Sequence, residues 1–236
     1  MIPIQKKDAP LELLELKKQA AEEGLNPKEA YAKLSNPLKR KVLEQLMEEQ
    51  GHICAYCMRK IPDERVNSED IPNAVIEHWF PRAPASGEDR GQGLDYNNFL
   101  AVCSGNQGKR GTRRKRDLTC DAKRKNRELK INPLDSSTLQ SIVYKSNGEI
   151  DTIDPEYEDD LFIKLNLNCV SPDVMLPQSR KMVLDAVQAE VAVFEGQERN
   201  SYCKYLLSKF EEEKDPKTPY IGIAIWWLKD YIKGAS

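Results

Sequence analysis

Apolar residues recur every three or four positions within residues 10–50, which is the spacing of helices with one buried face. The first predicted helix begins after Pro10 and ends near Gly24, and Pro27 begins a short second one. A third helix begins at Asn36, and its apolar positions are Leu38, Val42, Leu43, Leu46 and Met47. We interpret this apolar face as part of an ordinary core rather than as a groove for a partner.

Residues 51–132 lack this periodic pattern and are rich in cysteine, glycine, proline and basic residues. We expect short strands and loops here, followed by a helix from about Cys120 to Leu129. Such a segment buries little apolar surface, so a bound metal ion is a natural source of stability.

Residues 133–236 return to regular patterns. Two β-prone runs, 141–144 and 149–153, flank Asn147-Gly148, a dipeptide typical of tight hairpin turns. Helices are then predicted over three segments: 177–194, 199–214 and 219–233. The last carries Trp226 and Trp227, which either close the core or offer a docking surface. The acidic run 154–160 is expected to be a solvated loop.

Composition narrows the class of protein. The chain has 236 residues, of which 31% are charged and only 7% aromatic, so we expect a modest core and a highly solvated surface. No run approaches the roughly 18 apolar residues of a membrane span, and the first residues lack the apolar core of a signal peptide. We therefore expect a cytoplasmic protein with no membrane partner, in a compartment where cysteines stay reduced.

Four cysteines in the middle region have the context of a zinc site. Cys54 and Cys57 form a C-x-x-C motif, whose tight turn can direct both thiolates to one tetrahedral Zn²⁺. Cys103 and Cys120 are the candidates for the other two ligands, although a long loop separates them. The alternative is a redox C-x-x-C motif beside two unrelated cysteines, but redox motifs of this kind belong to a βαβ pattern, which this segment does not show.

The remaining cysteines, Cys169 and Cys203, lie beside apolar residues and are interpreted as inert core thiols. His52 directly precedes the C-x-x-C segment. No chemical role is predicted for it, unless it replaces Cys103 or Cys120 as a zinc ligand.

Candidate catalytic groups lie between these cysteines. Phosphodiester hydrolysis needs an activated water and a cation that neutralises developing charge. The imidazole of His78 suits the first task, because its ordinary pKa lies near neutrality. The carboxylates of Glu77 and Asp121 suit the second, because hard divalent cations prefer oxygen ligands. Glu77 and His78 point to opposite faces of a regular strand, but at a strand end both can turn toward one site.

The order of these motifs resembles that of HNH endonucleases: C-x-x-C, Glu-His, Asn-Phe-Leu-x-x-Cys and Cys-Asp-x-x-x-Lys. In that family a ββα-metal core holds a catalytic divalent ion, and two pairs of cysteines often bind a structural zinc ion. The resemblance implies that His78 is the general base and that Asn98 orders the loop and orients this histidine. It also implies that Glu77 and Asp121 bind the catalytic ion, Mg²⁺ or Mn²⁺. This sequence departs from the usual pattern at both carboxylates, where Asp is commoner first and His or Asn third.

Further segments resemble the nuclease subunits of Septu and retron-associated antiphage systems. They are the start Ile-Pro-Ile-Gln-Lys-Lys, the motif Glu-His-Trp-x-Pro-Arg, the segment Leu-Asp-Tyr-Asn-Asn, and Ile-Asn-Pro before the predicted hairpin. The match covers the middle region well and the rest loosely. It implies an ATPase partner with an SMC/ABC-like head, and a role in defence against phage DNA.

Basic residues far outnumber acidic ones within residues 106–130, in a chain whose formal net charge is only -2. A charge run is usually a solvated face, but this one lies between two proposed zinc ligands and surrounds Asp121, which favours contact with phosphates. The predicted nucleic-acid contacts are Arg82, Lys109, Arg110, Arg113, Arg114, Lys115, Arg116, Lys123, Arg124 and Lys125. Double-stranded DNA is the expected partner, because the sequence shows no aromatic platform typical of single-strand binders.

Together these patterns predict an α+β protein in three parts. They are a helical segment over 1–50, a zinc-stabilised HNH core of the ββα-metal type over 51–132, and a hairpin with helices over 133–236. The predicted function is a metal-dependent DNA endonuclease. Two alternatives stay open: a zinc-stabilised nucleic-acid-binding or adaptor module without catalysis, and an HNH nuclease that cuts RNA.

Overall fold

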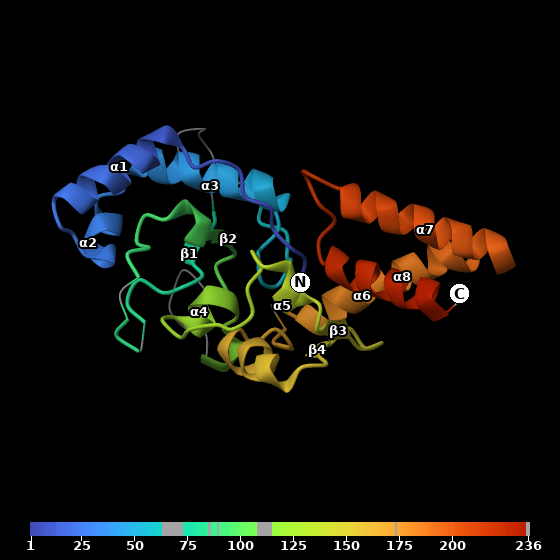
Figure 1. Cartoon of the computed structure of the whole chain (residues 1–236). Helices are drawn as coiled ribbons and strands as arrows, with labels where there is room; N and C mark the ends of the chain where they lie inside the picture. The colour runs from blue at the N-terminus through green and yellow to red at the C-terminus, as the bar shows by residue number, and fades with distance from the viewer. Residues whose placement is uncertain (63–72, 85, 89, 108–114, 173, 235–236) are drawn as a thin grey trace.

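The computed structural model describes residues 1–62, 73–84, 86–88, 90–107, 115–172 and 174–234 (Figure 1). Three helices lie at one end and three others at the opposite end, and two short sheets lie between them. Buried apolar side chains from all three predicted parts form one connected core. The mixed α and β architecture is therefore as expected.

The three N-terminal helices are confirmed: α1 (Leu11–Glu22), α2 (Pro27–Ala32) and α3 (Asn36–Gln50). Asn26 begins α2 with a capping box: its side chain accepts hydrogen bonds from the backbone, and its own N–H donates to the Glu29 carboxylate. Gly51 ends α3 in the left-handed region, at φ 64°, as helix C-termini commonly do. The apolar positions of α3 that are fully covered are Val42, Leu43, Leu46 and Met47. They belong to the core, as predicted.

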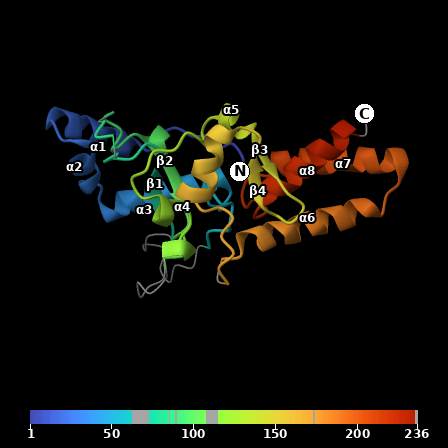
Figure 2. The ribbon, with the colours of Figure 1, turned by 90° about the horizontal axis from the view of Figure 1, so that it is seen from below.

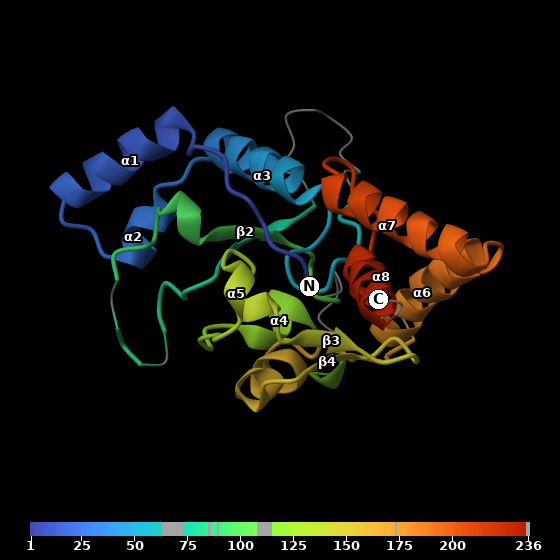
Figure 3. The same ribbon diagram turned by 45° about the vertical axis from the view of Figure 1, so that its right-hand side comes forward.

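The middle region contains one antiparallel strand pair and one short helix. Strand β1 (Val75–His78) pairs with β2 (Phe99–Val102), and the register places His78 opposite Phe99. Helix α3 packs against β2 on one side, and α4 (Cys120–Arg124) lies on the other side of the pair (Figures 1 and 3). The helix predicted to reach Leu129 is shorter than expected, because Lys125 adopts φ 58° and ends it.

The C-terminal region begins with α5 (Ser136–Leu139) and the predicted hairpin of β3 (Ile142–Tyr144) and β4 (Ile150–Thr152). Gly148 has φ 85° in its turn, which explains the strong Asn-Gly signal. Three helices follow and pack on one another: α6 (Leu176–Ala192), α7 (Gly196–Glu212) and α8 (Ile221–Gly234) (Figure 2). Both tryptophans of α8 are partly buried against the core.

The acidic run 154–160 is largely solvated, as expected, but it is helical rather than a loop and its last residue is buried. It forms a short 3-10 turn, η3 (Pro155–Tyr157), and the start of a π-helix, η4 (Asp159–Lys164). Asp160 is fully buried, and its carboxylate accepts hydrogen bonds from the backbone N–H of Lys130 and Ile131, at 2.5 and 2.9 Å, and from Lys164 Nζ. This carboxylate therefore anchors the chain that leaves α4.

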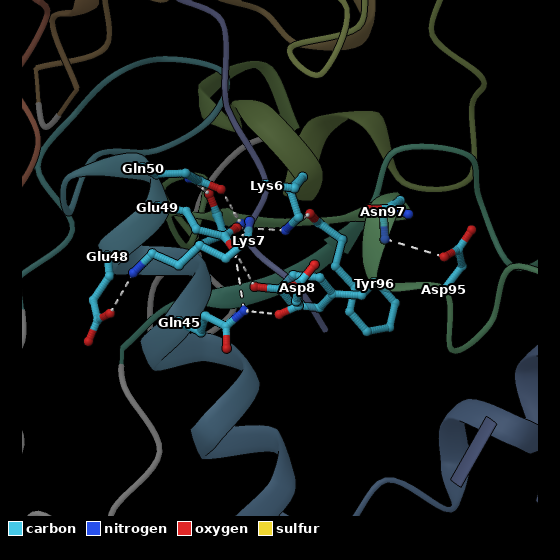
Figure 4. A network of polar contacts seen from close by, with 12 residues as sticks. Lys6, Lys7, Asp8, Gln45, Glu48, Glu49, Gln50, Asp95, Tyr96 and Asn97 are labelled. Atoms are coloured by element: carbon cyan, nitrogen blue, oxygen red, sulfur yellow. Dashed lines mark hydrogen bonds and ion pairs between the residues drawn. The ribbon is translucent and has the colours of Figure 1, made fainter. Parts of the chain in front are cut away.

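The first residues of the chain bind α3 and β2 through a polar network (Figure 4). Lys6 Nζ lies 2.8 Å from the Glu49 carboxylate, 3.2 Å from the carbonyl of Phe99 and 3.8 Å from the centre of the Tyr96 ring. The Tyr96 hydroxyl donates to the same carboxylate at 2.7 Å. Burial lowers the pKa of Lys6 to about 8, and the bond to Glu49 opposes that shift. The network thus joins the N-terminus to the strand that precedes the cysteine site.

Lys6→Met is expected to lower the free energy of unfolding by about 3 kcal/mol, because it leaves the fully buried Glu49 carboxylate without its cation. Urea denaturation measures the change, and adding Glu49→Gln should recover much of the loss. Lys7→Met is the matched control, since Lys7 pairs with Glu48 on the surface and should contribute less than about 1 kcal/mol. Equal effects of the two lysine substitutions would contradict this assignment.

Within the described residues, no helix combines the length and the apolar character needed to cross a bilayer.

Candidate metal centre and carboxylate site

Four buried cysteines converge at the centre of the molecule: Cys54, Cys57, Cys103 and Cys120. Their sulfurs all lie within 4.8 Å of one another, and three of the pairs are 3.8 Å apart. A tetrahedral ion with metal–sulfur bonds of about 2.3 Å requires sulfur–sulfur distances of about 3.8 Å. A disulfide would need about 2.05 Å, and all four cysteines are free. The group can therefore hold one metal ion such as zinc.

The local backbone explains how distant cysteines meet. Cys54 N–H donates to the carbonyl of Arg59, which closes the tight turn of the C-x-x-C motif, and Cys103 directly follows β2. Cys120 begins α4 with φ 51°. The long loop that weakened the sequence match returns to its own start, since the Thr119 N–H donates to the carbonyl of Gly105 at 2.9 Å. Cys103 and Cys120 are thereby brought together.

The charge around the sulfurs also suits a metal thiolate. The pKa of Cys103 is lowered by hydrogen bonds with Cys120, Cys54 and Cys57, whereas bonds to Cys103 and burial raise the pKa of Cys57 and Cys120. The cluster therefore carries at least one thiolate that a metal ion can share. Burial opposes ionisation of Arg59, but the charge of Cys57 and a bond with Tyr220 outweigh it and raise the pKa of this guanidinium. The positive charge of Arg59 thus lies near the buried sulfurs and offsets part of the cost of burying a thiolate.

The carboxyl groups of Glu77 and Asp121 meet beside the metal centre. Glu77 lies in β1 and Asp121 in α4, directly after the ligand Cys120, and the two side chains hydrogen-bond to each other. Burial raises the pKa of Glu77 to about 8, and Asp121 adds to this shift. Two carboxyl groups in contact repel when both are ionised, and a divalent cation relieves that repulsion. The pair can therefore take a hard cation.

Arg124 and Tyr56 hold one oxygen of the Glu77 carboxylate. Arg124 Nη1 pairs with Oε1 of Glu77, and the Tyr56 hydroxyl donates to the same oxygen at 3.1 Å. Arg124 also donates to the carbonyls of His78, at 3.0 Å, and Trp79. Arg124 and Tyr56 thus both contact Oε1 of Glu77.

The assignment of Arg124 to nucleic-acid binding is wrong. Its side chain is fully buried and all of its nitrogens donate inside the fold, so it cannot reach a phosphate. The sequence could not reveal this, because Arg124 lies in a run of basic residues whose adjacent members Lys123 and Lys125 are more exposed.

His78 faces away from the two carboxylates. Its Nε2 donates to the carbonyl of Gly93 at 3.1 Å, and its ring lies edge-on to those of Tyr31 and Phe99, both 4.8 Å away between centres. A carbonyl only accepts, so Nε2 carries the proton and Nδ1 keeps a free lone pair in the neutral ring. Burial lowers the pKa of His78 to about 3, which keeps the ring neutral at pH 7.

The three predicted catalytic groups do not form one ligand set. Among the described residues, the four cysteines are the only group of three or more potential ligands whose donor atoms converge. Strand alternation sends Glu77 toward α4 and His78 toward α2, so the frayed-end geometry that we expected is absent from β1. Tyr31 links the two sides, since its ring touches His78 and its pKa responds to the charges of Arg82 and Asp121.

Asn98 fixes the backbone directly after His78. Its amide nitrogen donates to the carbonyl of Phe80 at 2.9 Å, its amide oxygen accepts from the Phe80 N–H at 2.7 Å, and its carbonyl accepts from the Trp79 N–H. These three bonds hold the loop in one conformation. The loop-ordering contact expected of Asn98 is therefore present, although the amide does not touch the imidazole.

The other predicted nucleic-acid contacts differ in how exposed they are and in whether the structure describes them. Arg116 and Lys125 are exposed, while Lys123 and Arg82 are half-buried. Lys115 lies in the 3-10 turn η2 (Lys115–Asp117). The other predicted contacts lie outside the described residues: Lys109, Arg110, Arg113 and Arg114.

His52, Cys169 and Cys203, for which the sequence predicted no catalytic role, lie outside the cysteine cluster. His52 Nδ1 lies 2.5 Å from the Asp215 carboxylate, so it is not needed as a fourth ligand. Cys169 and Cys203 are buried apart from the cluster, as expected of core thiols.

Tyr56 and Tyr31 were not predicted as site residues. The place of Tyr56 inside the C-x-x-C motif was the one available signal, whereas nothing in the sequence marked Tyr31.

His78 should make the fold sensitive to acid. The unfolded chain binds a proton at this residue near pH 6.5, but the folded chain does so only near pH 3, so stability falls as the pH drops between these values. His78→Gln cannot titrate and should lack this loss. The difference in unfolding free energy between the two proteins should change by up to about 1.4 kcal/mol per pH unit, measured by urea denaturation. Parallel pH profiles would contradict the buried neutral ring.

Comparison with known proteins found no match to the chain, either among protein-family models or among curated proteins.

Proposed function

We propose that this protein is a metal-dependent endonuclease of the HNH type that hydrolyses phosphodiester bonds of DNA. The observation that carries the proposal is the contact between the Glu77 and Asp121 carboxyls beside a four-cysteine metal centre. A strand pair followed by a short helix supports both groups, and the resemblance of the sequence motifs to HNH endonucleases predicts that arrangement.

In this proposal the two metals have separate tasks. The cysteines hold a structural Zn²⁺, which fixes the backbone on either side of the carboxylates. Glu77 and Asp121 would hold Mg²⁺ or Mn²⁺, which supplies charge neutralisation at the phosphate and the leaving oxygen. Arg124 and Tyr56 hold the Glu77 carboxylate in place.

His78 is the proposed general base. Its Nδ1 lone pair accepts the proton of the attacking water, while the bond from Nε2 to the carbonyl of Gly93 holds the ring and its tautomer. The Asn98 clamp on Phe80 keeps the strand end in register with the carboxylates.

The biological setting rests on the resemblance alone. It predicts the effector of a cytoplasmic antiphage complex, with an SMC/ABC-like ATPase as partner and duplex DNA as substrate. We propose DNA rather than RNA because phage DNA is the target that the resemblance implies. Competition between DNA and RNA substrates separates the two.

Plasmid nicking in Mg²⁺ or Mn²⁺ tests the proposal, with and without the ATPase partner. Asp121→Asn should reduce the nicking rate by about 100-fold or more and should raise the metal concentration needed for half-maximal rate, because a carboxylate ligand is lost. Asp185→Asn, which changes an exposed aspartate of α6, is the matched control. Equal rates for wild type and Asp121→Asn would contradict the proposed ion site.

One observation favours the alternative of a nucleic-acid-binding or adaptor module without catalysis. Glu77 already pairs with the buried Arg124, and both it and His78 are well covered in the described structure. A wild-type protein that binds DNA but never nicks it, with either metal and with its partner, would favour this second reading.

A further inference from the structure

Two cations share one aromatic ring next to His78. The guanidinium carbon of Arg82 lies 4.0 Å from the centre of the Tyr31 ring, and Lys39 Nζ lies 5.6 Å from the same point. Tyr31 belongs to α2 and Lys39 to α3, whereas Arg82 follows β1. Tyr31 therefore connects the N-terminal helices to the proposed catalytic site.

Neither cation is neutralised by the part of the chain that the structure describes. Within those residues no carboxylate lies within ion-pair distance of Lys39 or Arg82, while neighbouring Lys41 is bound to Glu12 at 2.6 Å. Both side chains are half-buried rather than extended into solvent. Two like charges held over one ring repel each other, and an anion between or beside them relieves that repulsion.

The chemistry of the three residues fits a phosphodiester. A guanidinium stacked on an aromatic face keeps its planar edge free for two parallel hydrogen bonds to phosphate oxygens. An ammonium adds a second, less directional contact. Since the ring of Tyr31 is 4.8 Å from that of His78, a phosphate held here would lie close to the water that His78 is proposed to activate.

We propose that Lys39 and Arg82, supported by the ring of Tyr31, bind a backbone phosphate of duplex DNA beside the cleaved position. This inference rests on the proposed function for its substrate, and it assigns the helical N-terminal region a part in substrate binding. Tyr31 is a positioning residue, because it holds the two cations without reaching the reacting atoms.

Fluorescence anisotropy with a labelled DNA duplex tests the inference, in Ca²⁺ or EDTA so that no cleavage occurs. Each neutralised phosphate contact contributes about 0.9 to the slope of log K against log salt concentration for duplex DNA. Lys39→Gln and Arg82→Gln should each lower that slope by about this amount, measured between about 50 and 200 mM salt. Tyr31→Leu should weaken binding as well, whereas Tyr31→Phe keeps the ring and should bind like wild type.

Lys41→Gln is the matched control, because it removes the same charge from the same helix at a lysine already paired with Glu12. Unchanged slopes for Lys39→Gln and Arg82→Gln, or a wild-type protein that does not bind the duplex, would overturn the phosphate site. Plasmid nicking by the wild type separates this failure from that of the proposed function. If the wild type nicks plasmid but the slopes of the two variants are unaltered, only the phosphate site is refuted. If the wild type never nicks but the variants have lowered slopes, only the proposed nuclease activity is refuted.

Discussion

Replacement of Cys54 by serine is expected to abolish metal retention and to unfold the middle of the molecule. Purified wild-type protein should contain about one zinc ion per chain, and the variant close to none. The free energy of unfolding should fall by on the order of 5 kcal/mol, because loss of a structural metal belongs to the most damaging class of single substitutions.

The size of this effect follows from the composition of the middle region. The strand pair has only four residues on each side, and α4 has five, so these elements bury little apolar surface by themselves. The sulfur of Cys54 lies 3.8 Å from that of Cys120, and without a shared ion the four thiolates would repel one another in a desolvated site. A shared metal ion would therefore add to the stability that this region gains from the connected core.

Elemental analysis and thermal unfolding, each with and without a chelator, measure the two consequences. Cys203→Ser is the matched control: Cys203 is also fully buried, but it lies in α7 outside the cluster, and its variant should keep the metal. A wild-type protein that is stable and never contains a metal ion would show that the four cysteines serve another purpose.

His78→Gln is expected to reduce DNA nicking by about 100- to 10,000-fold, the range attributed to a positioned general base. Glutamine can still donate to the carbonyl of Gly93, but its amide cannot take up a proton from water. The loss should appear in the rate of the chemical step, while the metal concentration for half-maximal rate stays unchanged, because His78 does not touch the carboxylate pair.

A metal titration of the nicking rate distinguishes this result from the loss of an ion ligand in Asp121→Asn. His52→Gln is the control, since His52 is the other histidine of the chain and pairs with Asp215. If His78→Gln and wild type nick equally well, the imidazole is not the base. The Glu77–Asp121 ion site would then need another activator for water.

The features set by short-range pattern were predictable. Helix starts at Pro27 and Asn36 and the Asn147-Gly148 turn depend on a few neighbouring residues, and the structure confirms them. The cysteine site was also predictable, because four thiols in a short segment have few alternatives to a metal. The loop between Cys103 and Cys120 was the uncertain part.

Features set by long-range contact were not predictable. The sequence places Arg124 in a basic run that we expected to contact phosphates, and Asp160 in an acidic run that we expected to be a solvated loop. In the structure the side chains of Arg124 and Asp160 are both fully buried: Arg124 binds Glu77, and Asp160 binds backbone N–H groups of residues 130 and 131. Burial of a charge is decided by a partner far along the chain, which local composition does not record.

The placement of Tyr56 between two thiol ligands, and of Asp121 directly after a third, has a consequence for the living cell. The same short backbone segments carry both the sulfurs and the groups that would prepare a cation for catalysis. Lack of zinc, or an oxidant that joins the thiols in disulfides, would thus inactivate the proposed enzyme by displacing these groups. A newly made copy would stay harmless to host chromosomes until its zinc had been delivered.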